Sequence, residues 1–133
     1  MILTSVLCLW VKNVVTTLGY PTTVVQWGVE DDEPVGSQIV LSGGVSNGSH
    51  TSGVFRRTSY QLTVIGPQGD EEWPERVAGQ LFDYLEAQRG IRIDGHYVLQ
   101  IQSDGPYPAT TDVGEDRYRY EAIYVFDVSR ERV

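Results

Sequence analysis

The sequence predicts an α+β domain, in which two helices pack on one face of a mainly antiparallel sheet of about five strands. Two observations carry this prediction: two segments whose apolar residues recur every three or four positions, and several segments in which apolar and polar residues alternate. A chain of 133 residues is long enough to bury one core. We therefore expect a single domain that spans residues 1–133.

The first helix is predicted from Leu3 to Leu18, where Val6, Leu7, Trp10 and Val11 begin an apolar stripe of helical period. Gly19 follows the last apolar position and should end the helix. The valines and threonines of this segment lower its helix propensity, so a strand is the competing interpretation. The opening residues lack the basic region and cleavage site of a signal peptide, so we interpret them as part of a buried helix.

Two short strands are predicted next, at Thr22–Trp27 and Ser37–Leu41. The acidic run Glu30–Glu33 between them is expected to form a solvated loop. Gly43–Gly53 is so rich in Gly, Ser, Asn and Thr that it predicts a long mobile loop without packed structure.

A third strand is predicted at Phe55–Ile65, where Tyr60, Leu62 and Val64 alternate with polar residues. Asp70 is positioned to cap a second helix. The inward stripe of this helix comprises Val77, Ala78, Leu81, Phe82 and Leu85, and Gly90 is expected to end it.

Two further strands complete the prediction, at Gly95–Gln102 and Arg117–Val128. In the first, Tyr97, Leu99 and Ile101 should share one side, and Gly105–Pro108 should end the extended structure. In the second, one face carries Tyr118, Tyr120, Ala122, Tyr124, Phe126 and Val128. This tyrosine row could stack on nucleotides or sugars, but packing beneath the helices is the favoured interpretation.

Charge argues against nucleic-acid binding. Ten basic and 18 acidic residues give a net charge of −8, and no basic patch is segregated along the chain. Cys8 is the only cysteine, so the fold cannot depend on an internal disulfide, and a reducing cytoplasm is expected. No stretch is apolar over the roughly 18 residues that a membrane span requires.

No residue pattern predicts catalysis, a metal site or a cofactor. The only histidines, His50 and His96, show no metal-binding spacing and are interpreted as surface or turn residues. Asp31, Asp32 and Glu33 lack the ligand spacing of an EF-hand, and Gly43–Gly53 lacks the lysine and hydroxyl residue of a phosphate-binding loop. We expect a protein that is not an enzyme.

Several segments resemble a known family. They are Arg57–Val64, the helix through Val77 to Leu85, Ile101–Pro108 with its Asp104-Gly105-Pro106, and Asp116–Ala122. Together they are similar to the tail-terminator and minor capsid (tail completion) proteins of long-tailed bacteriophages. The first helix and the strand after it also fall in the family's order, so the resemblance covers most of the chain.

The resemblance implies a structural subunit that forms a hexameric ring at the head-proximal end of the tail tube, stops tube polymerisation and offers the surface that joins the head. Its partners would be other copies of itself, the tail tube protein and a head-tail connector or head-completion protein, without a membrane, a cofactor or sequence-specific contact with DNA. Such a protein is assembled in the host cytoplasm and resides in the tail or neck of the virion.

A closed ring needs an interface between unlike surfaces and segments that become ordered on contact. The candidate residues for contact with another subunit or with the tube are Gly43, Gly44, Asn47, His50, Gly53, Phe55, Arg56, Pro67 and Trp73. An acidic lining would let DNA slide through the channel, and the candidates for it are Glu30, Asp31, Asp32, Glu33, Asp112, Glu115 and Asp116.

Two alternatives stay open. One is another neck or head-completion connector protein of the same virion. The other belongs to a different class, a small ligand-binding domain or enzyme that uses the tyrosine-rich strand and the segment from Asp104 to Asp116. That alternative predicts a concave pocket and a monomer or dimer, whereas the terminator predicts a ring.

Overall fold

The structure is a computed structural model that describes residues 2–28, 36–49, 55–109 and 118–132, with the backbone alone for residues 45–49, 55 and 130–132. In chain order its elements are α1 (Thr4–Thr17), β1 (Val24–Trp27), β2 (Gln38–Ser49), β3 (Phe55–Ile65), α2 (Glu72–Glu86), β4 (Arg89–Ile93), β5 (His96–Ala109) and β6 (Arg119–Arg132). The predicted α+β class is confirmed, with six strands in the described part where about five were expected.

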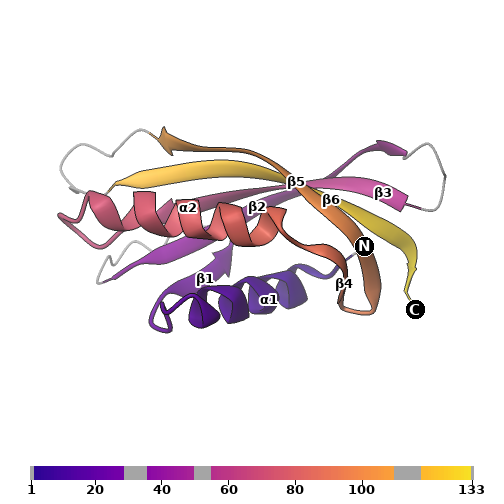
Figure 1. Ribbon diagram of the computed structural model, residues 1–133, viewed down its shortest axis with the longest axis horizontal. Helices are drawn as coiled ribbons and strands as arrows, with labels where there is room; N and C mark the ends of the chain where they lie inside the picture. The colour runs from indigo at the N-terminus through magenta and orange to yellow at the C-terminus, as the bar shows by residue number, and fades with distance from the viewer. Residues whose placement is uncertain (1, 29–35, 50–54, 110–117, 133) are drawn as a thin grey trace.

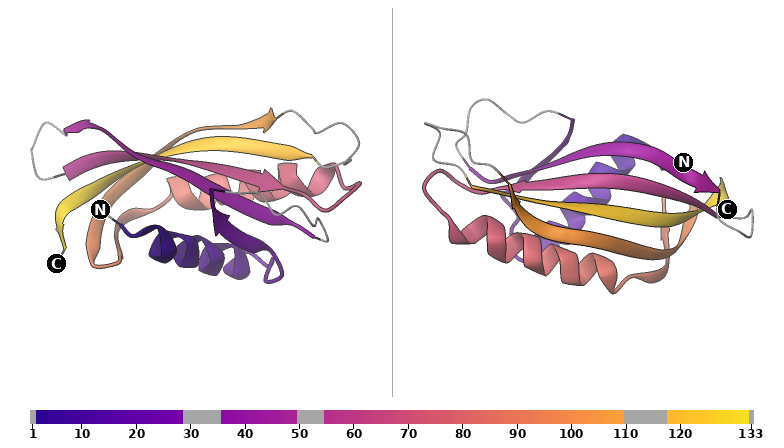
Figure 2. Two further views of the ribbon diagram at one scale, coloured as in Figure 1. Left: turned by 180° about the vertical axis from the view of Figure 1, so that it is seen from behind. Right: turned by 90° about the horizontal axis from the view of Figure 1, so that it is seen from above.

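The strands form one curved sheet of order β1-β2-β3-β6-β5-β4. β1 runs parallel to β2, and every other neighbouring pair is antiparallel. Figure 1 shows α1 and α2 side by side on the same face of this sheet, and the views in Figure 2 agree. The opposite face is not covered by any helix or strand that the structure describes.

The core lies between the helices and the sheet. Its buried residues include Leu7, Val11, Val14 and Val15 of α1, Val77, Ala78, Leu81 and Leu85 of α2, and Ile39, Leu41, Tyr60, Leu62, Val64, Ala122, Tyr124, Phe126 and Val128 of the sheet. The Phe126 ring meets Trp10 of α1 edge to face at 6.4 Å between centroids and Tyr60 at 5.2 Å. The tyrosine row of β6 therefore packs beneath the helices, as predicted: Tyr124 is buried and Tyr120 is half-buried.

Both helices confirm the predicted periodicity. α1 is a helix and not the competing strand, because its buried positions follow the helical period. At the start of α2 the Asp70 carboxylate accepts the backbone N–H groups of Glu72 at 3.2 Å and Trp73 at 3.0 Å, as a capping side chain does. The helix ends at Glu86, before the predicted end at Gly90, which instead lies within β4.

The prediction of a loop from Gly43 onward is wrong as far as Ser49, because β2 continues through Gly43 and Gly44 to that residue. The continuation contains a bulge, since the pairing with β3 shifts between Gly43 and Val45. Gly43 has a φ of +97°, and a Cβ there would lie 2.9 Å from the carbonyl oxygen of Ser59. Glycine is thus required here for strand pairing and not for flexibility.

The predicted break at Gly105–Pro108 is also wrong. β5 continues to Ala109, and its register against β6 shifts between Asp104 and Tyr107. Gly105 has a φ of +119°, and a Cβ there would lie 3.0 Å from the Glu121 carbonyl oxygen. The glycine lets the strand bulge against β6 without ending it.

Further irregular pairing near the start of β5 changes which side chains face the core. Register shifts on both sides of Val98 make Val98 and Ile101 the buried residues, whereas Tyr97 and Leu99 are only partly buried. His96 was expected at the surface or in a turn, but it is 5% exposed, and its Nδ1 lies 3.2 Å from the Ser129 carbonyl oxygen. Pairing with β6 buries this residue.

Candidate assembly surface

The sheet face opposite the helices is the main surface that the fold leaves uncovered, and we call it the open face. Side chains alternate between the two sides of a strand, so the partners of the buried residues on each strand point to this side. Its residues are Val40 and Ser42 of β2, Arg57, Ser59, Gln61 and Thr63 of β3, Gln100, Gln102, Asp104 and Tyr107 of β5, and Glu121, Ile123, Val125 and Asp127 of β6.

Among the described residues, three large apolar side chains are exposed on this side of the sheet: Val24 on the edge strand β1, which is 49% exposed, and Ile123 and Tyr107 on β6 and β5. Ile123 is 45% exposed and Tyr107 is 58% exposed. They belong to neighbouring strands, because Tyr107 pairs with Glu121, two residues before Ile123. Burying such a side chain fully contributes roughly 1.5–3 kcal/mol, so contact with a partner here would be favourable.

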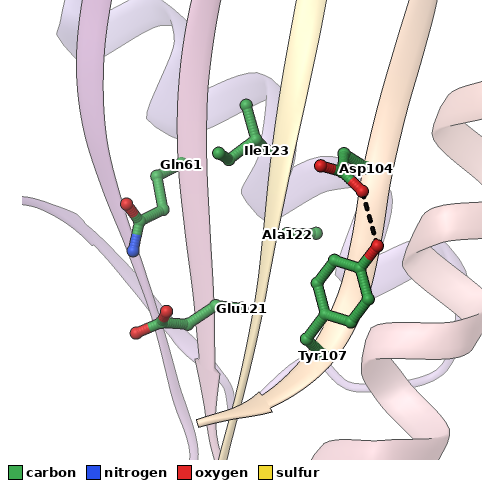
Figure 3. A pocket seen from close by; sticks show the side chains of 6 residues that line it. All are labelled: Gln61, Asp104, Tyr107, Glu121, Ala122 and Ile123. Atoms are coloured by element: carbon green, nitrogen blue, oxygen red, sulfur yellow. Dashed lines mark hydrogen bonds between the residues drawn. The ribbon is translucent and has the colours of Figure 1, made fainter.

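Ile123 and Tyr107 line a shallow depression with Gln61, Asp104, Glu121 and Ala122, as Figure 3 shows. The Tyr107 hydroxyl donates a hydrogen bond of 2.6 Å to Asp104 Oδ1. This bond, together with the negative charge of Asp104, raises the pKa of the Tyr107 phenol. The hydrogen bond therefore holds the exposed ring in a defined orientation beside Ile123.

Neither depression of the open face resembles a small-molecule site. The first has a volume of about 120 Å³. A second, lined by Gly28, Val40, Ser42, Thr63, Ile65, Arg119 and Glu121, has about 270 Å³. Pockets for drug-sized ligands have roughly 300–1,000 Å³. Within the described residues, no group of three or more His, Cys, Asp or Glu side chains is placed to hold a metal ion.

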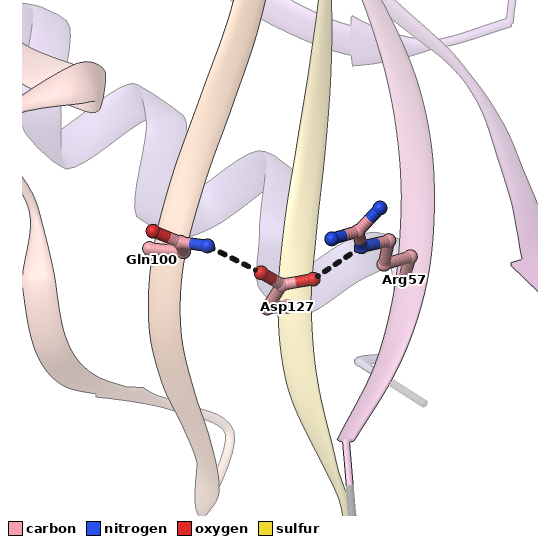
Figure 4. Close-up of polar contacts among 3 residues, drawn as sticks. All are labelled: Arg57, Gln100 and Asp127. Atoms are coloured by element: carbon pink, nitrogen blue, oxygen red, sulfur yellow. Dashed lines mark hydrogen bonds and ion pairs between the residues drawn. The ribbon is translucent and has the colours of Figure 1, made fainter. Parts of the chain in front are cut away.

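A polar contact across three strands stiffens the open face (Figure 4). Asp127 of β6 accepts a hydrogen bond from Arg57 Nε of β3 at 3.3 Å and one from Gln100 Nε2 of β5 at 2.8 Å. Both carboxylate oxygens thus have partners, as a buried charge requires. The buried Asp127 places the half-exposed Arg57 on the open face.

Five of the candidate contact residues fall into two groups at opposite ends of β3. Arg56 is exposed near the start of β3 and pairs with Ser49 of β2, while Phe55 begins the strand and Asn47 lies in β2. Pro67 and Trp73 follow the other end of the strand, roughly 30 Å away at the rise of an extended chain. The structure does not bring the two groups together.

Trp73 has an internal contact that accounts for its partial burial. Its ring meets Tyr20 edge to face at 5.7 Å between centroids, and the Tyr20 hydroxyl donates to Gln80 Oε1 at 2.6 Å. Tyr20 follows α1, whereas Trp73 and Gln80 belong to α2. Trp73 therefore helps to join the two helices, and its role in a subunit contact stays a prediction.

Gly43 and Gly44 form the β2 bulge, so they shape the sheet from within. His50 and Gly53 lie outside the described residues, as do all seven candidate lining residues, Glu30, Asp31, Asp32, Glu33, Asp112, Glu115 and Asp116. Ile123, Tyr107 and Arg57 were not among the candidates. The alternation of β6 indicated that Ile123 faces away from the tyrosine row, but no sequence signal showed that this face lacks a covering layer.

Among the described residues, no helix is both long and apolar enough to span a membrane. No family model and no curated protein sequence matches the chain. A chain from the virion of a native gene transfer agent particle aligns with a TM-score of 0.67 at 15% identity, over 92% of this chain and 90% of that one. A second solved protein, whose name states no function, aligns with a TM-score of 0.59 at 20% identity, over 96% of this chain and 90% of that one. At these identities the likeness establishes a shared fold, two helices on one face of a curled mixed sheet.

Proposed function

We propose that this chain is a structural protein of a phage-like virion, and more narrowly a tail-terminator subunit. It forms a hexameric ring at the head-proximal end of the tail tube, ends tube polymerisation and provides the surface that joins the head. The observation that carries the proposal is the open face, where Ile123 and Tyr107 are exposed on the same side of the sheet as Arg57, which the buried Asp127 holds in place. A rigid sheet with exposed apolar residues suits contact between proteins.

The structural similarity to a chain from a virion supports the same proposal. The alignment covers 92% of this chain and 90% of the chain from the gene transfer agent particle, so the two chains share one fold over most of their lengths. A small subunit whose two open-face depressions have only about 120 and 270 Å³ suits a part that works through its surfaces. We therefore place the protein in the tail or neck of a virion assembled in the host cytoplasm, and not among the enzymes.

The proposed partners are other copies of this chain, the tail tube protein and a head-tail connector or head-completion protein. The acidic segments Glu30–Glu33 and Asp112–Asp116 are the proposed channel lining. Their negative charge would keep passing DNA from adhering, because like charges repel across a narrow, poorly screened channel.

The test is the mass of the protein measured by light scattering, alone and with purified tail tube protein, followed by electron microscopy of the complexes. We expect six-fold rings that cap the tube ends and limit tube length. Tubes of unchanged length without a cap would contradict the terminator role.

A neck or head-completion protein is the nearest alternative, since it would use the same kind of surface. Rings that bind the head connector but not the tube would favour it.

The alternative of a different class, a small ligand-binding domain or enzyme, would have to use the depression at Asp104, Tyr107 and Glu121. A persistent monomer that ignores both tube and connector would support that alternative. The depression has a volume of only about 120 Å³, and Tyr124 is buried, so little aromatic surface is left for stacking on a base or sugar.

A further inference from the structure

The side of α1 that is turned away from the sheet carries no exposed charge. Lys12 is the only charged residue in α1, and its ammonium donates to the carbonyl oxygens of Pro21 at 2.7 Å and Thr23 at 2.5 Å. The exposed residues are Ser5, Leu9, Asn13, Thr16 and Thr17 on that side of α1, and Leu3 and Thr4 at its N-terminal end; together we call them the outer face of α1. Leu3 and Leu9 are each 60% exposed.

The neighbouring helix shows the usual pattern for contrast. The exposed side of α2 carries Glu72, Glu75, Arg76 and Asp83. Solvated helices normally present charged residues in this way, and a chain with a net charge of −8 has many to place. An outer face without charge but with two exposed leucines is therefore typical of a surface that a partner covers.

This outer face and the open face lie on opposite sides of the molecule. Figures 1 and 2 show α1 beneath the sheet, so its outer face points away from the sheet and the open face points the other way. Leu3 and Leu9 are exposed on one surface, and Ile123 and Tyr107 are exposed on the other. One subunit therefore carries two unlike apolar patches that cannot contact each other within the same molecule.

Charge favours a second copy of this chain as the occupant. Two copies with a net charge of −8 repel each other overall, so a contact between them needs a local attraction that offsets this repulsion. The first turn of α1 holds no acidic residue, and Leu3 provides no side-chain cap, so the partial positive charge of the helix N-terminus is not neutralised there. On the open face, the carboxylates of Asp104 and Glu121 line the same depression as Ile123 and Tyr107. The two patches are thus complementary in both charge and polarity.

We infer that the outer face of α1 docks on the open face of an adjacent copy, so that Leu3 and Leu9 pack against the partner subunit's Ile123 and the partner subunit's Tyr107. The inference rests on the proposed ring and names the surfaces that build it. Contact between unlike patches leaves one free patch at each end, so it continues from copy to copy and closes when the rotation per subunit completes a circle.

The test uses two charge insertions, Leu9→Glu and Ile123→Glu, with Ala87→Glu as the matched control. Ala87 is exposed at the C-terminal end of α2 and belongs to neither patch, and the control adds the same charge. Sedimentation over a range of concentrations should show self-association weakened roughly 30-fold or more by each insertion and unchanged by the control. Circular dichroism checks the fold, and the milder pair Leu9→Gln and Ile123→Thr replaces any variant that does not fold.

The decisive measurement is the mass of an equimolar mixture of Leu9→Glu and Ile123→Glu. The first variant retains an intact open face and the second an intact outer face of α1, so the mixture should form a heterodimer and nothing larger, while each variant alone stays monomeric. A mixture that stays monomeric, either variant assembling alone as the wild type does, or a wild type that stays monomeric at every concentration would overturn the inference.

Electron microscopy of each variant with tail tube protein distinguishes a failure of this inference from a failure of the proposed function. If both variants cap tubes as rings like the wild type, the docking contact is wrong and the terminator role stands. If the mixed variants pair as expected but the wild type never caps a tube, the contact stands and the terminator role is wrong.

Discussion

Asp127 and Arg57 share an ion pair with very unequal exposure: the Asp127 side chain is 2% exposed and the Arg57 side chain 47%, with 3.3 Å between Asp127 Oδ1 and Arg57 Nε. The carboxylate is covered because β3 and β5 flank it on both sides, and Gln100 donates to its other oxygen. Arg57 therefore closes the solvent side of a buried charge.

Removing Arg57 should cost more stability than removing its neighbour. Arg57→Met leaves the buried carboxylate with one partner fewer, and we expect a loss of about 1–2 kcal/mol, discounted because Arg57 is half exposed. Arg56→Met is the control, since Arg56 is exposed and its loss should change the free energy of unfolding by less than about 0.5 kcal/mol. Urea unfolding measures both, and equal stability of the two variants would show that the pair contributes nothing.

Two glycine-to-alanine changes should act in opposite directions. Gly43→Ala places a Cβ 2.9 Å from the Ser59 carbonyl oxygen at a φ of +97°, so we expect a loss of about 1–3 kcal/mol. Gly79→Ala lies within α2, where a Cβ meets no atom within 4 Å, and should stabilise by about 0.5–1 kcal/mol. Thermal unfolding compares them. A neutral Gly43→Ala would mean that the β2 bulge does not need glycine.

Alkaline pH should destabilise the protein through Tyr124. Burial, reinforced by the nearby carboxylates of Glu86 and Asp83, raises the pKa of this phenol above its ordinary value of 10.0. The folded state therefore keeps a proton that the unfolded state loses, so stability is full below about pH 10 and falls above it by up to about 1.4 kcal/mol per pH unit.

Tyr124→Phe removes this ionisation. The free energy of unfolding of the variant, measured with urea across the alkaline range, should fall less steeply with pH than that of the wild type. Parallel curves for the two proteins would show that Tyr124 does not control the alkaline limit.

The contribution of the α2 cap to the free energy of unfolding should be measurable as well. Asp70→Ala removes the acceptor for the backbone N–H groups of Glu72 and Trp73, and we expect a loss of about 1 kcal/mol. Asp70→Asn keeps an oxygen acceptor and should lose less. If chemical denaturation finds the two variants equally unstable, the charge of Asp70 matters more than its hydrogen bonds.

Local sequence was sufficient for the elements whose pattern is long and regular. α1 and α2 follow a sustained helical period, β3 has the predicted bounds Phe55–Ile65, and the buried row of β6 runs through Ala122, Tyr124, Phe126 and Val128. In each, side-chain burial repeats with the period of the backbone, so the pattern is visible in the sequence alone.

Pairing between strands explains the elements that were predicted wrongly. Gly43 and Gly105 signal loops in isolation, yet both lie within strands, because hydrogen bonds to β3 and β6 hold the chain extended around a bulge. β4 was missed because its Arg-Gly-Ile-Arg-Ile segment is short and contains a glycine, and it forms a strand only by pairing with β5. These outcomes depend on a neighbour that is distant in the chain.

The candidate surface also has one part that local sequence shows and one part that only packing decides. The absence of charge from the outer face of α1 can be read from the sequence, since Lys12 is the only charged residue between Thr4 and Thr17. The helical and strand periods of this protein, its acidic charge and its buried tyrosines all follow from residue order, because each depends on neighbours a few positions away. The strand order and the exposure of Ile123 and Tyr107 depend on which distant segments pack together, and local residue patterns do not reveal that packing.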